Sequence, residues 1–133
     1  MLEVSLTEAE VSAIFTRSGE VEWQLIAPGV SKKALRSDGR TGESAILLKF
    51  EAGATYPLHN HPGGEEIFAL EGEVRIGKHQ LRAGDYLYTP PEGKHAVSSQ
   101  NGCLVFLRLS KPIEILEPGL NPAAGQATAD LIA

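Results

Sequence analysis

The sequence predicts an all-β domain, built as a small barrel or sandwich. Glycine and proline, 14 and 8 of the 133 residues, are spread along most of the chain and separate short segments. These segments are rich in strand-forming residues and recur about every 8 to 12 residues, which is typical of all-β folds. Helical periodicity is confined to the N-terminus. The length suits one domain with its own hydrophobic core.

The first residues predict a short helix. Thr7 and Glu10 have the Thr-x-x-Glu form of a capping box. Apolar residues then recur at helical spacing until Gly19 ends the pattern. We therefore assign residues 1–19 to an N-terminal helical segment.

The strands are expected between residues 20 and 110, which we assign to the barrel. Turn sequences such as Glu71-Gly72 and Asn101-Gly102 separate them. The predicted strands are Val21–Ile26, Ala45–Phe50, Glu66–Glu71, Glu73–Ile76, His79–Arg82, Tyr86–Thr89, His95–Ser98 and Leu104–Leu109. Residues 111–133 are rich in Pro, Gly and Ala and are predicted to form a C-terminal arm.

The charge pattern excludes several classes of partner. The net charge is −5, and the basic residues are scattered, so we expect no nucleic-acid partner. Lys32, Lys33 and Arg36 are predicted to lie on a solvated face.

No apolar run approaches the length of a membrane span, and the N-terminus lacks the pattern of a secretory signal. The expected setting is the reducing cytoplasm, because Cys103 is alone and cannot form an internal disulfide.

Three histidines and a glutamate stand out as candidate metal ligands. Side chains two apart in a strand point the same way, so His59 and His61 can converge on one point. Pro62-Gly63-Gly64 then turns the chain, and Glu65 can return to the same point. His95 follows a second segment framed by glycine and proline and is the expected third imidazole. Mixed nitrogen and oxygen donors suit Zn, Fe, Mn, Ni or Cu better than Mg or Ca.

Two nearby residues, Glu66 and His79, could also be considered as metal ligands. Glu66 would face the opposite side of a strand from Glu65, so only one of them can contact the metal, and the spacing favours Glu65. His79 lies beside the predicted turn Gly77-Lys78, and we expect it in a solvated hairpin rather than at the metal.

The spacing of these residues resembles the motifs of the cupin superfamily. The first motif reads Gly53-x5-His59-x-His61-x3-Glu65-x6-Gly72. The second reads Gly84-x5-Pro90-x2-Gly93-x-His95, with its inner glycine shifted by one residue. The resemblance implies a small jelly-roll-like β-barrel, here preceded by a short N-terminal helix, with a metal inside held by His59, His61, Glu65 and His95.

A narrower resemblance is to the cupin domain of ChrR-type anti-sigma factors and their stand-alone relatives. It rests on the runs His61–Glu73, Pro90–His95 and Gly102–Leu107, and it covers roughly residues 20–110. Those anti-sigma factors bind their sigma factor through a separate N-terminal zinc domain with His and Cys ligands. This chain has neither the residues nor the length for such a zinc domain, so we do not expect sigma-factor binding to carry over. The same cupin type also resembles small acetylacetone-cleaving dioxygenases.

Two functions follow from these expectations. The first is a ChrR-like sensor or binding module that holds a divalent transition metal, with zinc expected and iron or manganese as alternatives. The second is a small non-haem Fe(II) dioxygenase that acts on a β-diketone or phenolic substrate. In either case we expect a small-molecule ligand in the barrel and a homodimer formed through an exposed strand edge.

Overall fold

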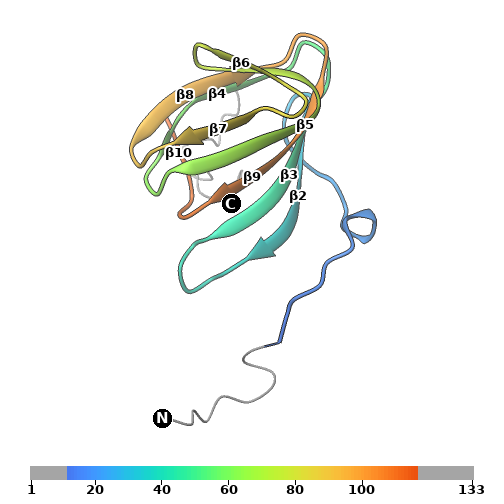
Figure 1. Cartoon of the computed structure of the whole chain (residues 1–133), viewed down its shortest axis with the longest axis vertical. Helices are drawn as coiled ribbons and strands as arrows, with labels where there is room; N and C mark the ends of the chain where they lie inside the picture. The colour runs from blue at the N-terminus through green and yellow to red at the C-terminus, as the bar shows by residue number, and fades with distance from the viewer. Residues whose placement is uncertain (1–11, 117–133) are drawn as a thin grey trace.

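A computed structural model describes residues 12–116 of the chain and contains ten strands in that range (Figure 1). The one helical element between residues 12 and 116 is a single 3₁₀ turn, η1, at Ser18–Glu20. The strands are β1 Gln24–Ala27, β2 Val30–Ser37, β3 Ser44–Phe50, β4 Thr55–His61, β5 Glu65–Ile76, β6 His79–Arg82, β7 Tyr86–Thr89, β8 Gly93–Ser98, β9 Cys103–Leu109 and β10 Glu114–Ile115. The predicted all-β barrel is confirmed.

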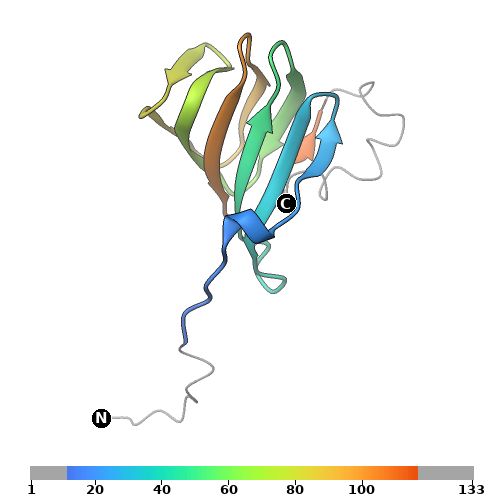
Figure 2. The same ribbon diagram turned by 90° about the vertical axis from the view of Figure 1, so that its right-hand side faces the viewer.

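The long strand β5 joins two antiparallel sheets that curl around one interior. Its first half pairs with β9 and β7, and the sheet continues through β3 and β2 to β1. Its second half pairs with β6 and β8, and that sheet continues through β4 to β10. Figures 1 and 2 show the curl from two directions. Both sheets therefore contribute side chains to the same core.

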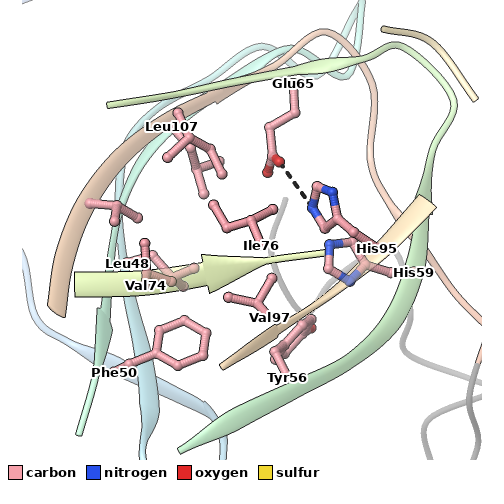
Figure 3. Close-up of a pocket in the computed structure, with 12 residues that line it drawn as sticks. Leu48, Phe50, Tyr56, His59, Glu65, Val74, Ile76, His95, Val97 and Leu107 are labelled. Carbon is pink, nitrogen blue, oxygen red and sulfur yellow. Dashed lines mark ion pairs between the residues drawn. The ribbon is translucent and has the colours of Figure 1, made fainter. Parts of the chain in front are cut away.

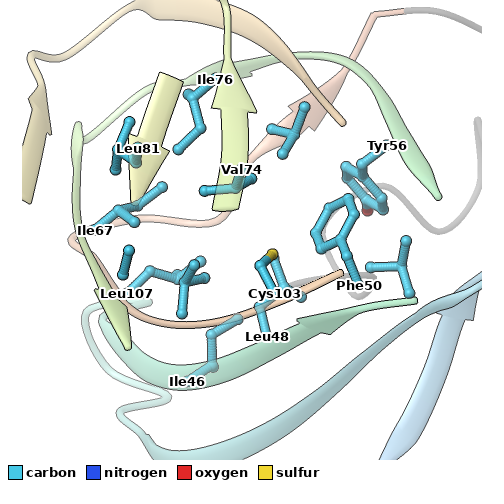
Figure 4. Close-up of a cluster of buried hydrophobic side chains, with 14 of the residues drawn as sticks. Ile46, Leu48, Phe50, Tyr56, Ile67, Val74, Ile76, Leu81, Cys103 and Leu107 are labelled. Atoms are coloured by element: carbon cyan, nitrogen blue, oxygen red, sulfur yellow. The ribbon is translucent and has the colours of Figure 1, made fainter. Parts of the chain in front are cut away.

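The core follows from strict alternation along the strands. Buried and half-buried residues alternate over the whole length of β3 and of β9, as expected for strands with one face inside. The inward side chains Ile46, Leu48, Val105 and Leu107 are at most 5% exposed, and they pack with residues of β5 and β6 (Figure 4). Each such aliphatic side chain stabilises the fold by about 1.5–3 kcal/mol through its burial.

The turn predicted at Glu71-Gly72 is absent, because β5 continues through it. The pairing with β9 shifts register between Ala69 and Glu71, which marks a bulge. Gly72 has a φ of 75°, and a Cβ atom there would collide with the Gly102 carbonyl oxygen. Glycine thus allows the strand to bend and pass from one sheet to the other.

The predicted N-terminal helix is wrong over residues 12–17, where the backbone is not helical. Of the predicted helical segment, only the 3₁₀ turn η1 is helical among the described residues, and none of its residues is buried. A short amphipathic segment gains little from its own hydrogen bonds and needs a core to pack on. The proposed capping pair Thr7 and Glu10 lies outside the described residues.

Three strands were missing from the predicted set, although the predicted convergence of His59 and His61 already assumed an extended backbone at β4. β2 carries lysine, arginine and serine, β4 contains proline and the polar run His59-Asn60-His61, and β10 has two residues. The expectation of a solvated face at β2 is wrong for Lys32, which is 4% exposed and paired in register with the inward-facing Leu48. β10 pairs with β4, and Ile113 just before it is 1% exposed. Among the described residues, no helix has the length and apolar character needed to cross a membrane.

Candidate metal centre

Three histidines converge inside the barrel because β4 and β8 pair in a fixed register. His59 lies directly opposite His95, and His61 lies two residues further along β4 on the same face. The ring centroids are 4.3–4.9 Å apart. One ring nitrogen from each histidine lies within 4.8 Å of the others. The side chains are 0–8% exposed, so this is a buried imidazole cluster.

Glu65 reaches the same cluster from the start of β5. The turn before it depends on Gly64, which has a φ of 82° and lies so close to the Thr89 carbonyl that a Cβ atom would approach it to 2.9 Å. Glu65 Oε1 lies 3.3 Å from His61 Nε2 and 3.5 Å from His95 Nε2. Figure 3 shows the carboxylate pointing at His95, with His59 alongside. The structure therefore brings all four predicted residues together.

Backbone carbonyls fix the orientation of two of the rings. His59 Nδ1 donates to the Pro57 carbonyl and His61 Nδ1 donates to the Gly93 carbonyl, each at 2.7 Å, when the proton is on Nδ1. The Pro57 carbonyl is available because β4 shifts register between Tyr56 and His59. With the proton held on Nδ1, the Nε2 lone pair of each neutral ring is free to bind a cation.

The charges in the cluster follow from burial and mutual contact. Burial lowers the pKa of His59 to about 4, so this imidazole is neutral near pH 7. Burial also lowers the pKa of His61, but the Glu65 carboxylate and the Gly93 carbonyl outweigh it, and the net shift is upward. Burial raises the pKa of Glu65, but His61 and His95 outweigh it and hold that pKa at about 2. Glu65 is therefore a buried carboxylate anion.

The donor atoms of this cluster are not satisfied by the protein. His61 Nε2, Glu65 Oε1 and His95 Nε2 are buried, and none has a hydrogen-bond partner with good geometry among the described residues. Buried polar atoms without a partner are rare and destabilising in folded proteins. Imidazole nitrogens and a carboxylate oxygen are a donor set that suits a borderline transition metal. The residues present thus fit such an ion.

Residues 11–112 match the family described as the ChrR Cupin-like domain. The chain belongs to this family. The resemblance seen in its motifs is thereby confirmed, and the fold agrees with it. No curated protein sequence matched this cupin.

Solved structures show the same fold. An RmlC-like cupin protein from Ralstonia eutropha JMP134 matches with a TM-score of 0.76 and 22% identity, over 87% of this chain and 80% of its own. An acetylacetone dioxygenase from Acinetobacter johnsonii matches with a TM-score of 0.69 and 13% identity, over 96% and 99%. The Rhodobacter sphaeroides complex of SigE with the anti-sigma factor ChrR matches with a TM-score of 0.61 and 26% identity, over 70% of this chain and 50% of the matched chain.

The two competing residues point away from the cluster in this cupin. Glu66 faces outward, where it accepts a hydrogen bond from the Tyr86 hydroxyl at 2.6 Å. His79 is exposed beside the β5–β6 turn. Both placements agree with the alternation expected of a strand and a hairpin.

One contact behind the cluster was missed by sequence reasoning. The Asn60 amide donates to Glu92 Oε1 at 3.0 Å and to Glu114 Oε1 at 2.8 Å. The Glu92 backbone N–H in turn donates to the His61 carbonyl at 2.8 Å. Asn60 therefore links β4, the turn before β8 and β10 on the outer side of the histidines. In the sequence, the only sign of this role was the position of Asn60 between the candidate ligands His59 and His61.

A small cavity adjoins the histidines inside the barrel. Its volume is about 20 Å³, the space for about one water molecule. His59, Glu65 and His95 line one side, and the other lining residues are apolar except for Tyr56 (Figure 3). The Tyr56 ring packs edge-on against His59 with centroids 5.5 Å apart. The Tyr56 hydroxyl is buried and has no hydrogen-bond partner among the described residues.

Proposed function

We propose that this cupin is a metal-binding sensor or binding module in which His59, His61, Glu65 and His95 hold one divalent transition metal. The observation that carries the proposal is a set of three buried atoms, two imidazole nitrogens and a carboxylate oxygen. Each nitrogen lies 3.3–3.5 Å from the oxygen, but none of the three has a hydrogen bond of good geometry among the described residues. A cation at their centre would satisfy all of them at once. It would also offset the charge of the buried Glu65 carboxylate.

We propose zinc as the metal. Four protein ligands of the N₃O type complete a tetrahedral zinc site, and binding to such a site stabilises the folded state directly. The adjoining cavity of about 20 Å³ leaves room for about one water-sized group beside the ligands. Iron and manganese accept the same donors and are the alternatives.

We do not propose that this cupin binds a sigma factor. The match covers 50% of the matched chain in the SigE–ChrR complex, so half of that chain has no counterpart in the match. A reducing compartment remains our prediction for this protein, and it is supported by the one free cysteine of the described residues, Cys103, which is buried.

Metal analysis tests the proposal. The wild-type protein, His95→Ala and His79→Ala would be purified, stripped with a chelator and reloaded with zinc, and the bound metal would be measured by mass spectrometry. We expect one equivalent in the wild type and in His79→Ala, because His79 is exposed and is not part of the histidine cluster. We expect none in His95→Ala. Full metal content in His95→Ala, or no metal in the wild type, would contradict the assignment.

A second candidate is a small non-haem Fe(II) dioxygenase. What favours it is the apolar cavity beside His59, in which the Tyr56 hydroxyl could donate a hydrogen bond to an oxygen of a small ligand. Three histidines leave coordination positions open on an octahedral iron if Glu65 does not bind it. Oxygen uptake by iron-loaded protein with acetylacetone or a phenol would establish this function. No uptake, together with retained zinc, favours the binding module.

A further inference from the structure

Glu92, in the turn before β8, has a backbone conformation that is unusual for its residue type. Its φ is 70°, and no other non-glycine residue between 12 and 116 has a positive φ. A side chain disfavours this left-handed conformation because its Cβ atom comes too close to a neighbouring carbonyl oxygen. Such a conformation persists only where surrounding contacts hold it, and it is concentrated at functional sites. The contacts of Glu92 are therefore a guide to its role.

Two adjacent positions of this turn suit glycine for different reasons. At position 93 the reason is space, because a Cβ atom on Gly93 would collide with Thr89 Cγ2. At position 92 the reason is the positive φ, which glycine adopts without strain. The chain has glycine only at 93, which accounts for the one-residue shift of the inner glycine in the second cupin motif. A side chain is thus retained at 92 despite the strain.

The Glu92 side chain is tied to a buried residue of β4. Asn60 is 5% exposed, and its Nδ2 donates to Glu92 Oε1 at 3.0 Å and to Glu114 Oε1 at 2.8 Å. The two carboxylates can only accept hydrogen bonds, so they fix which end of the Asn60 amide faces them. A hydrogen bond to a carboxylate is charge-assisted and stronger than one between neutral groups. We call the Asn60–Glu92 hydrogen bond the turn clamp.

Two further bonds join the same turn to His61, the residue directly after Asn60. The Glu92 N–H donates to the His61 backbone carbonyl at 2.8 Å. The Gly93 carbonyl accepts from His61 Nδ1 at 2.7 Å when the proton is on Nδ1. The direction of the Gly93 carbonyl depends on the backbone conformation of Glu92 and Gly93. The residue that holds Glu92 at its positive φ therefore also determines where the acceptor of the His61 ring lies.

We propose that Asn60 and Glu92 are positioning residues for the candidate metal centre, because their contact holds the turn in which the Gly93 carbonyl orients the His61 ring. This inference rests on the proposed function, since it assigns the two residues a role toward one ligand of that site. A partner behind a ligating histidine fixes the ring, and its loss typically lowers metal affinity by about 10- to 100-fold. Asn60 and Glu92 act one step further away, so we expect a loss near the lower end of this range.

Glu92→Gly separates positioning from a contribution to folding alone. Glycine relieves the strain at position 92, and this offsets the lost hydrogen bond, so the metal-free variant should unfold at about the same urea concentration as the wild type. Zinc affinity, measured by competition with a chromophoric chelator, should nevertheless fall by about tenfold. Unchanged zinc affinity in Glu92→Gly would overturn the proposal. A parallel loss of stability and affinity would also overturn it, because the contact would then serve folding only.

Two controls separate positioning from a simple effect of charge. Glu92→Gln removes the charge but keeps an oxygen that can accept from Asn60 Nδ2, so zinc affinity should stay within about threefold of the wild type. Glu114→Ala removes the other acceptor of the same amide, which lies on β10 rather than in the turn, and it should bind zinc like the wild type. If Glu92→Gln loses as much affinity as Glu92→Gly, the effect is electrostatic and the proposal is wrong.

Hydrogen exchange of the metal-free protein tests the turn clamp without zinc. Asn60→Leu keeps about the same side-chain shape and removes the amide. In NMR exchange measurements, the Glu92 N–H should exchange at least about tenfold faster in this variant than in the wild type, whereas the amides of β9 should be unchanged. Equal protection of the Glu92 N–H in both proteins would overturn the proposal. If the wild type binds no zinc, the proposed function fails, and the exchange rates still decide whether Asn60 holds the turn.

Discussion

The Tyr56 hydroxyl offers a sharp test of how the barrel interior is built. Tyr56 is 2% exposed, and its hydroxyl has no hydrogen-bond partner among the described residues. Burial raises the pKa of Tyr56, so the hydroxyl stays protonated and is a donor without an acceptor. Leaving such a group unpaired destabilises the fold by about 1–3 kcal/mol. Tyr56→Phe should therefore increase the free energy of unfolding rather than decrease it.

The net effect is somewhat smaller than this desolvation energy. Removing one oxygen atom leaves about 10 Å³ of extra space, which costs about 0.2 kcal/mol at about 24 cal/mol per Å³ of cavity. We expect a net gain of about 1–2 kcal/mol. In urea unfolding without metal, this would raise the transition midpoint by about 0.5–1 M, with the slope unchanged.

Tyr86→Phe is the control for this experiment. Tyr86 is 56% exposed and its hydroxyl donates to Glu66, so its replacement should lower stability slightly or leave it unchanged. If Tyr56→Phe is no more stable than the wild type, the Tyr56 hydroxyl has a partner in the folded protein, and our reasoning about the cavity is refuted.

Three further outcomes are expected. Glu65→Gln should weaken zinc binding by at least about tenfold in calorimetric titration, and Glu66→Gln should not, because only Glu65 faces the histidines. Equal effects of the two would contradict the ligand assignment. Zinc affinity should fall as the pH drops through the raised pKa of His61, because a protonated imidazole cannot bind the metal; titrations at several pH values measure this, and a flat profile would count against it. Gly72→Ala should lower the free energy of unfolding by more than about 2 kcal/mol in thermal or urea unfolding, because it combines a positive φ with a collision at the Gly102 carbonyl; a wild-type stability would show that the bend in β5 does not need glycine.

The sequence was sufficient for the barrel and for the four clustered side chains. The strand pattern predicted β3 and β9 almost to the residue, because the inward face of β9, and that of β3 apart from Ser44, is apolar. The first motif placed His59 and His61 on one face of a strand. The three-residue spacing between His61 and Glu65 in that motif favoured Glu65 over Glu66 as the ligand. The structure has these side chains meeting inside the barrel.

Other features depend on contacts between distant parts of the chain. β4 lacks a strand signal of its own because its inner face carries histidines where other strands carry aliphatic residues. The partners of Asn60 are 32 and 54 residues away, so no local pattern predicts them. The helix prediction over residues 12–17 was wrong because periodicity describes what a segment can form, whereas a packing partner decides whether it does.

Strand β5 belongs to both sheets, and this affects the order in which the protein folds. Its first half pairs with β9, more than thirty residues later, and its second half pairs with β8 of the other sheet. The four clustered side chains lie on β4, β5 and β8, so they meet only when these distant strands have closed on one another. Folds dominated by such non-local pairing form in milliseconds to seconds. Any ion held at the cluster is therefore captured late, by a nearly complete barrel, and it would slow unfolding far more than it would speed folding.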